Sequence, residues 1–334
     1  MGTSKSTSYV KKIAILSIVF FFIFILALTN GAADVGIKDA LLGVFGSNIE
    51  GDALIIREVR LPRVLAAIII GAGLGIAGAM IQGLTRNPLA DPGLLGITAG
   101  ASLMLTVGYI MSASISFFVL TGLSFVGAII GIVLVIGLSL FSKEQLSTFT
   151  LLLVGASVSM FLFALSQGLS LLFDVTKNVN MWTAGGLTAV TFKQLMVVAP
   201  LLLIACFVAF YYAKEITILS LDENLAIALG RNVKYIKIVL MIIIALLTGM
   251  AVALAGNLAF VGLMIPHIVR KVVGYDYKRI IPTSVLIGGM FMMAADLLAR
   301  TINRPFEVPL IAVVSVIGLP FFLVIVRTHK GGEM

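Results

Sequence analysis

Five arginines gather at the ends of two uncharged apolar segments. Arg57, Arg60 and Arg63 come just before one segment, and Arg300 and Arg304 come just after the other. A guanidinium group carries paired N–H donors that match the two oxygens of a carboxylate, so this pattern predicts recognition of acidic side chains on a partner. The spacing also fits long cationic side chains that reach from the ends of membrane spans to the surrounding water. Spacing alone leaves both interpretations open.

A second polar cluster interrupts an apolar stretch in the last third of the chain, GNLAFVGLMIPHIVR. Asn257, Pro266 and His267 are unusual at membrane depth, where non-helical backbone is tolerated only if it is buried in protein or lines a cavity. His267 has the chemistry of a proton relay. Because Arg270 and Lys271 lie within one turn of it, a structural or subunit-contact role is favoured.

The sequence lacks the residues that ATP hydrolysis, a structural zinc site or a membrane-embedded active site would need. The sequence contains no G-x-x-x-x-G-K-[ST] phosphate loop, so the chain cannot hydrolyse ATP by that route. Two His and one Cys supply neither a disulfide framework nor an ordinary structural zinc site. A membrane-embedded enzyme would need acids, His or Cys clustered at depth, and the apolar segments hold no such cluster. The sequence therefore predicts no enzymatic activity, no metal site and no directly bound cofactor.

One glycine motif has two interpretations. Gly73, Gly75 and Gly78 match a dinucleotide-binding fingerprint, which needs a preceding strand and a polar phosphate site. These glycines instead lie in the middle of an uncharged run, within a ridge of small residues that favours close helix packing. The ridge consists of Gly71, Gly75, Ala79 and Gly83.

Composition places the whole chain in a membrane. Of its 334 residues, 60% are hydrophobic and 11% are charged, and the mean hydropathy is +1.16. A soluble globular protein has about 25% charged residues. The net charge of +8 would also suit nucleic acid, but basic loops that orient a membrane protein explain it better. The lipid bilayer, rather than nucleic acid, is the predicted surrounding.

Uncharged runs of membrane length predict a single all-α transmembrane domain, residues 1–334, with about ten spans. The first run follows Lys11 and Lys12 and resembles a signal peptide, but no convincing cleavage site follows it, so a retained span is predicted. The eighth is short and broken by Gly262 and Pro266. The predicted spans are 13–28, 64–83, 94–111, 117–141, 149–172, 195–213, 235–255, 258–273, 281–299 and 308–326.

Basic residues predict that both termini are cytoplasmic. With residues 1–11 inside, 15 basic residues fall on the cytoplasmic side and 8 on the outer side. Residues 31–59 then form a partly amphipathic external segment. Asn87 and Pro88 open a tight turn, NPLADPG, whose prolines and glycine cannot continue a helix.

The longest cytoplasmic connection, residues 214–234, contains a predicted short helix. Its start has acids in the first turn, and Gly230 ends it. An exposed amphipathic helix fits a groove on a protein partner, although it could also rest on lipid headgroups. The face is short and has acids instead of a Lys/Arg-rich polar side, which favours the protein partner. The predicted apolar face consists of Leu225, Ala226 and Leu229.

Taken in order, five blocks of sequence are similar to those of one family. They are RLPRVLAA, NPLADPGLLG, GNLAFVGLMIPHIVR, ADLLAR and EVPLIAVVSVIGLPFF, and they extend from Arg60 to Phe322. The chain resembles the permease subunits of iron-siderophore and cobalamin ABC importers, which reside in the cell (inner) membrane. This resemblance implies ten spans, a second permease subunit, identical or paralogous, two cytoplasmic ATPase subunits that bind ATP–Mg, and an external substrate-binding protein. It implies an iron-siderophore or related iron chelate as cargo, with cobalamin or haem as alternatives.

The resemblance also implies roles for particular residues. Arg60, Arg63 and Arg300 match arginines that face acidic residues on the binding protein. Leu146, Ser147 and Thr148 match the region that narrows the cytoplasmic end of the pathway, which the fifth span lines. The segment that couples to the ATPase contains Leu219, Asp222, Glu223, Ala226, Leu229, Gly230 and Arg231.

A more distant alternative is a secondary transporter driven by protons or sodium. Such proteins usually keep ionisable residues near the membrane midplane. The predicted spans are nearly free of charge, and Asp174 and Asp296 lie near span ends. ATP dependence of transport in reconstituted vesicles separates the two classes.

Overall fold

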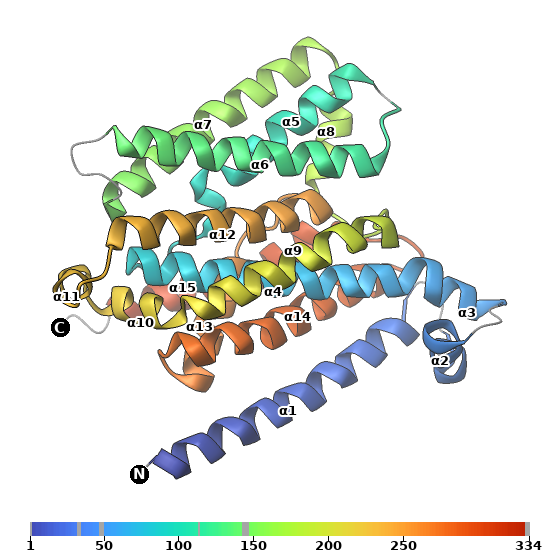
Figure 1. The fold of residues 1–334 in the computed structure, drawn as a ribbon. Helices are drawn as coiled ribbons and strands as arrows, with labels where there is room; N and C mark the ends of the chain where they lie inside the picture. Colours follow the sequence, from blue (N-terminus) through green and yellow to red (C-terminus); the bar gives the residue numbers. More distant parts are fainter. Residues whose placement is uncertain (1, 32–34, 47–49, 113, 142–146, 331–334) are drawn as a thin grey trace.

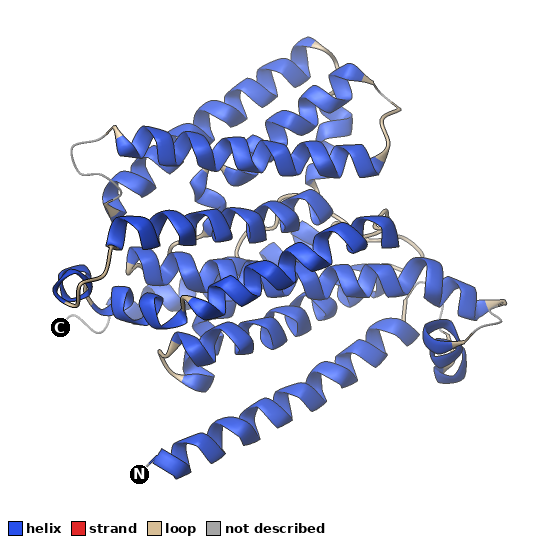
Figure 2. Ribbon diagram, viewed as in Figure 1, coloured by secondary structure: helices blue, strands red, loops and turns tan. Residues whose placement is uncertain are grey.

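The computed structural model describes residues 2–31, 35–46, 50–112, 114–141 and 147–330, and every regular element within them is a helix (Figures 1 and 2). The first half of the chain forms α1 (Gly2–Thr29), α2 (Ile37–Phe45), α3 (Asp52–Ile55), the π-helical turn η1 (Ile56–Arg60), α4 (Leu61–Thr85), the 3-10 turn η2 (Pro92–Leu95), α5 (Ile97–Met111) and α6 (Phe117–Leu140). They are followed by α7 (Thr148–Leu172), α8 (Thr176–Thr183), α9 (Phe192–Tyr211), α10 (Ala213–Leu221), α11 (Glu223–Ala228), α12 (Val233–Ala255), α13 (Val261–Val273), α14 (Tyr277–Thr301) and α15 (Leu310–Lys330).

Seven helical segments of the described chain are long and apolar enough to cross a membrane, and two shorter apolar helices, α5 and Leu310–Ile325 of α15, accompany them. The predicted eighth span corresponds to α13, which has only 13 residues. The all-α membrane fold is therefore confirmed, while the count of ten spans stays a prediction. Figure 1 places the start of α1 and α11 at one end of the bundle and α2 with α3 at the other.

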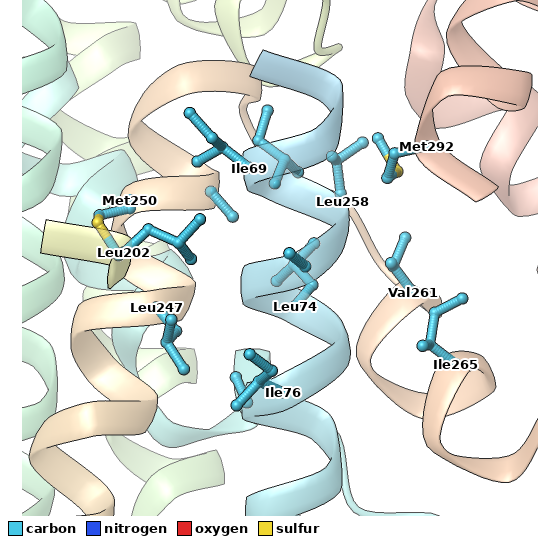
Figure 3. Packing of buried hydrophobic residues seen from close by; sticks show 14 of the residues in the cluster. Ile69, Leu74, Ile76, Leu202, Leu247, Met250, Leu258, Val261, Ile265 and Met292 are labelled. Carbon is cyan, nitrogen blue, oxygen red and sulfur yellow. The ribbon is translucent and has the colours of Figure 1, made fainter. Parts of the chain in front are cut away.

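Helix α4 is the centre of the fold. In the continuous helical segment Asp52–Thr85, 83% of the most apolar window is buried. Leu74 and Ile76 of α4 lie between Leu247 of α12 on one side and Ile265 of α13 on the other (Figure 3). Helix α1, by contrast, is peripheral: only 17% of its most apolar window is buried.

The small residues of α4 let neighbouring backbones approach, as predicted. A Cβ at Gly71 would meet the carbonyl of Gly288 in α14, and a Cβ at Gly78 would meet the carbonyl of Gly262 in α13. Gly83 lies against the ring of Tyr277. Packing, and not nucleotide binding, accounts for the glycine motif.

Candidate functional site

Three arginines and two carboxylates form one cluster at the end of the bundle that carries α2 and α3. Arg63 is at its centre: Nε donates to Asp296 Oδ1 at 2.9 Å and Oδ2 at 3.1 Å. The other edge of the same guanidinium donates to Glu307, from Nη1 at 2.7 Å and from Nη2 at 3.1 Å. Arg300 Nε lies 3.2 Å from Asp296 Oδ2, one helical turn away on α14. We call Arg60, Arg63, Asp296, Arg300 and Glu307 the arginine cluster.

The arginine cluster also holds the end of α1. Arg60 Nη1 donates to the carbonyl oxygens of Leu28 and Thr29, both at 2.8 Å. Arg300 Nη2 donates to the carbonyl oxygen of Ala27 at 2.7 Å. The last carbonyls of a helix have no partner within it, so these two arginines act as a C-terminal cap supplied by η1 and α14.

The structure corrects one assumption behind the predicted docking role of these arginines. Arg60, Arg63 and Arg300 are 5%, 4% and 3% exposed, so their guanidinium groups are internal and neither project from the surface nor reach toward water as anchors. Their intramolecular partners were not predicted from the sequence. The spacing of Asp296 and Arg300 by four residues was the available signal, because such a pair shares one face of a helix. Docking itself stays a prediction.

The predicted coupling segment folds as α10 and α11, close to the start of α12. Asp222 caps α11: its Oδ1 accepts a hydrogen bond from the Leu225 N–H at 3.0 Å. Gly230, with φ +73°, ends the helix in the left-handed conformation. Lys237 of α12, which is buried, donates to both Glu223 oxygens at 2.8 and 2.9 Å and holds α11 against the bundle.

Two further ion pairs brace this segment at the surface. Arg231 lies 3.6 Å from Glu215, and Arg86 lies 3.8 Å from Asp222. The second pair connects α11 to the turn after α4. Both arginine side chains are 41% exposed, so each pair contributes little stability by itself.

The exposed apolar face of α11 differs from the predicted one. Leu225 and Leu229 are exposed, at 45% and 56%, and Ile227 is exposed at 58%. Ala226 is 1% exposed and Leu219 is 3% exposed, so both pack inside the chain and cannot meet a partner. Leu225 and Ala226 are adjacent apolar residues on a short helix, so the sequence alone does not show which of them faces inward. That depends on the helices that pack against α11.

The predicted gate is only partly described. Leu146 lies outside the described residues. Ser147 caps α7 by accepting a hydrogen bond from the Thr150 N–H at 3.2 Å. Thr148 is the first residue of α7. The helix that follows is widely exposed, with Met160 and Phe161 at 74% and 66%.

Helix α15 has a similar exposed face. Val316 and Val324 are 74% and 61% exposed, and Leu323 is 58% exposed. Apolar faces of this size on α7 and α15 are covered in a bilayer either by lipid or by another protein chain.

The remaining motif residues form turns and contacts. Asn87 Oδ1 accepts from the Leu89 N–H at 2.9 Å, which closes the turn that begins at Asn87 and Pro88. Pro266 is buried inside α13, and Gly262 lets α13 approach α4. The ring of His267 packs edge-on against Phe321 of α15, with 5.8 Å between centroids.

An all-helical bundle with a buried central helix, long apolar helices and apolar outer faces defines a multi-pass membrane protein. Comparison of the sequence with known protein families identifies the family. The model of the FecCD transport family matches residues 18–328, and the chain belongs to this family.

Characterised relatives cover most of the chain. It is 38% identical over 310 residues to the iron(3+)-hydroxamate import system permease FhuB of Bacillus subtilis, covering 92% of this chain and 80% of FhuB. It is 40% identical over 282 residues to the iron-uptake system permease FeuB of the same organism, covering 84% of each. It is 33% identical over 319 residues to the hemin transport system permease HmuU of Yersinia pestis, covering 93% and 95%.

A solved structure shares the fold. It is an inward-facing conformation of a metal-chelate type ABC transporter, with a TM-score of 0.83 and 26% sequence identity. The match covers 96% of this chain and 99% of that chain.

Proposed function

We propose that this chain is the permease subunit of an ABC importer that carries an iron chelate across the cytoplasmic membrane. The similarity to FhuB over 92% of the chain is the observation that supports this most strongly, because FhuB is named for iron(3+)-hydroxamate import. FeuB is named for iron uptake. Relatives named for ferric citrate and ferric enterobactin match over 98% of the chain. Haem is the second candidate cargo because HmuU is similar over 93% of the chain.

The proposed assembly needs several partners. A second permease subunit, identical or paralogous, covers the exposed faces of α7 and α15. Two ATPase subunits bind ATP–Mg and receive α11, whose exposed Leu225 and Leu229 suit an apolar groove. The chain itself binds no nucleotide in this scheme, since its sequence has no phosphate loop.

An external binding protein delivers the chelate to the opposite end. The arginine cluster supports this part of the proposal through its charge, because it contains three guanidinium groups and two carboxylates and so carries one net positive charge. Glu307 is the exposed member, with 36% of its side chain accessible. Acidic groups on a binding protein would be attracted to this end of the molecule.

Uptake measurements test the proposed function. In a strain that lacks its own copy of this gene, we expect loss of radiolabelled iron uptake from one class of chelate, with restoration by the cloned chain. Ferric hydroxamate, catecholate, citrate, haem and cobalamin are compared in parallel, and the purified chain alone is assayed for ATP hydrolysis. Unchanged uptake of every iron source, or loss of cobalamin uptake alone, would refute the proposed cargo. ATP hydrolysis by the isolated chain would refute the proposal that a separate subunit hydrolyses ATP.

Replacement of Leu229 by aspartate is expected to uncouple the importer while leaving the permease folded. The side chain is 56% exposed, so the charge is tolerated in the free chain, but an ATPase groove would have to desolvate it at a cost of several kcal/mol. The measurement is co-purification of the ATPase together with transport. Asn224→Asp, an exposed change on the same helix, is the matched control. Full complex yield with normal transport in Leu229→Asp would exclude this face as the contact.

A further inference from the structure

Helix α2 exposes large apolar side chains at the end of the bundle that carries the arginine cluster. Ile37, Leu41 and Phe45 recur every fourth residue, so they form one stripe along the helix. They are 65%, 57% and 83% exposed, and Leu42 beside them is 42% exposed. Lys38 is the charged residue on this side of the helix. A stripe of this composition is unfavourable in water and indicates a surface that something apolar covers.

The other side of α2 is fixed against α3 and η1. A Cβ added at Gly43 would lie 2.6 Å from Ile56 Cβ and 2.7 Å from the carbonyl oxygen of Ala53, so α2 is in close contact with the backbone there. Arg57 Nη1 donates to the carbonyl oxygen of Gly46, just past the end of α2, at 3.0 Å. These contacts determine which side of α2 faces away from the bundle.

The same contacts give the depth of α2 relative to the membrane. Gly43 packs beside Ile56, four residues before Arg60, and Arg60 holds the last carbonyls of α1. Four helical residues rise by about 6 Å, so α2 lies within that distance of the level at which α1 ends. The polar headgroup layer on each side of the hydrocarbon core is about 5–8 Å thick. Since α1 is a membrane span, α2 lies at the depth of the headgroups.

The direction of α2 also fits the membrane surface. Figure 1 shows α2 almost along its axis, whereas α1 and α4 run across the view. Helix α2 therefore crosses the direction of the spans, as does a helix that lies in the plane of the membrane surface. It lies on the side of the bundle that α1 occupies, and α7 lies on the opposite side (Figure 1). A second permease subunit on α7 would leave α2 uncovered.

The neighbouring surface of α1 shows what covers the stripe. Helix α1 contacts α2, and Phe21, Phe22 and Ile25 of α1 are 63%, 61% and 48% exposed. In a membrane span such side chains face the acyl chains of lipid. The apolar surface of α1 continues into that of α2, so the same lipid layer covers both. Lys38 can extend its ammonium group from the stripe to the lipid phosphates.

From these contacts we infer that α2 is an interfacial helix, whose stripe of Ile37, Leu41 and Phe45 is embedded among the phospholipids that surround α1. Because α2 is attached to η1, and η1 continues into α4, the membrane surface also sets the height of the arginine cluster. The inference does not depend on the identity of the cargo or of the partner subunits.

Tryptophan fluorescence of the full-length chain in lipid nanodiscs tests the inference. Trp182 is the single tryptophan, and its Nε1 makes no hydrogen bond among the described residues, so Trp182→Phe supplies a silent background. In that background Phe45→Trp and Ile37→Trp, at opposite ends of α2, are each exposed to phospholipids brominated near the headgroups and to aqueous iodide. An interfacial helix buries its apolar face by about 5–10 Å, so we expect bromine to quench both tryptophans at least twofold more than an exposed control.

Asp52→Trp is the matched control, because Asp52 is exposed at the start of α3, which projects farther from the bundle than α2 (Figure 1). Iodide should quench the control more strongly than either α2 variant. Equal quenching of Phe45→Trp and Asp52→Trp by iodide would overturn the inference, because the stripe would then lie in water. Protection from both quenchers would also overturn it, since protein would then cover the stripe. So would bromine quenching of only one α2 variant, because the helix would then stand out of the membrane plane. Leu41→Trp replaces either variant that does not fold.

Discussion

Replacement of Arg63 by alanine is expected to destabilise the protein by about 3–5 kcal/mol, the usual effect of removing one member of a buried ion pair. The Arg63 guanidinium binds Asp296 with one edge and Glu307 with the other. Asp296 is 1% exposed, so its carboxylate would remain buried with only Arg300 to compensate it. The segment that carries Glu307 toward α15 would also lose its attachment to α4.

The measurement is the yield of monodisperse protein and its melting temperature in detergent. Arg63→Lys should be intermediate, because an ammonium group keeps the charge and cannot make both bidentate contacts. Lys193→Ala, which removes an exposed charge, is the matched control and should change stability by less than about 0.5 kcal/mol. Wild-type stability of Arg63→Ala would show that the cluster is energetically neutral.

The same cluster changes how its predicted docking role can be tested. Reversal of Arg60, Arg63 and Arg300 to glutamate would place new carboxylates beside Asp296 and Glu307 and would unfold this end of the bundle. Loss of binding in that variant would therefore say nothing about docking. Glu307→Gln is the better probe, because it adds to the net positive charge at an exposed position and should strengthen attraction of an acidic partner at low salt.

The second large effect is expected at Gly78. An alanine there would drive its Cβ into the carbonyl group of Gly262, so α4 and α13 would have to separate. Overpacking of a core typically costs 1–3 kcal/mol, and a contact with backbone that cannot rotate away should exceed about 3 kcal/mol. We expect little or no folded protein, as judged by size-exclusion chromatography after membrane extraction.

Gly137→Ala provides the matched control, because a Cβ at Gly137 on α6 meets no atom within 4 Å. Alanine favours a helix over glycine by up to about 1 kcal/mol, so this variant should be as stable as the wild type or slightly more stable. If Gly78→Ala and Gly137→Ala gave the same yield of folded protein, α4 and α13 would not approach each other as closely at Gly78 as the structure shows.

Local sequence signals were sufficient for much of the fold. Uncharged runs located the long helices, because the bilayer forces backbone polar groups to pair within each helix. The small residues of α4 predicted close packing, although not that Gly288 and Gly262 would be the partners. The acids at 222 and 223 predicted the approximate start of α11 and Gly230 predicted its end, since capping depends on residues close in sequence.

Contacts between distant residues could not be read in the same way. Arg63 and Asp296 are 233 positions apart, and each alone looks like a charge at a span end. The interior position of Ala226 depends on how α11 packs against α10 and α12. Helix α8 was also missed, because a helix of eight residues has too few turns to show a clear apolar period.

The cap on α1 has a consequence for biosynthesis. Arg60 follows 31 residues after Thr29, so its contacts with the end of α1 can form soon after that helix is made. Arg300, which binds Ala27, lies 273 residues farther along the chain than Ala27 and is made much later. The end of α1 is therefore capped in two stages, and its last partner arrives only after the helices from α4 to α13 have been synthesised.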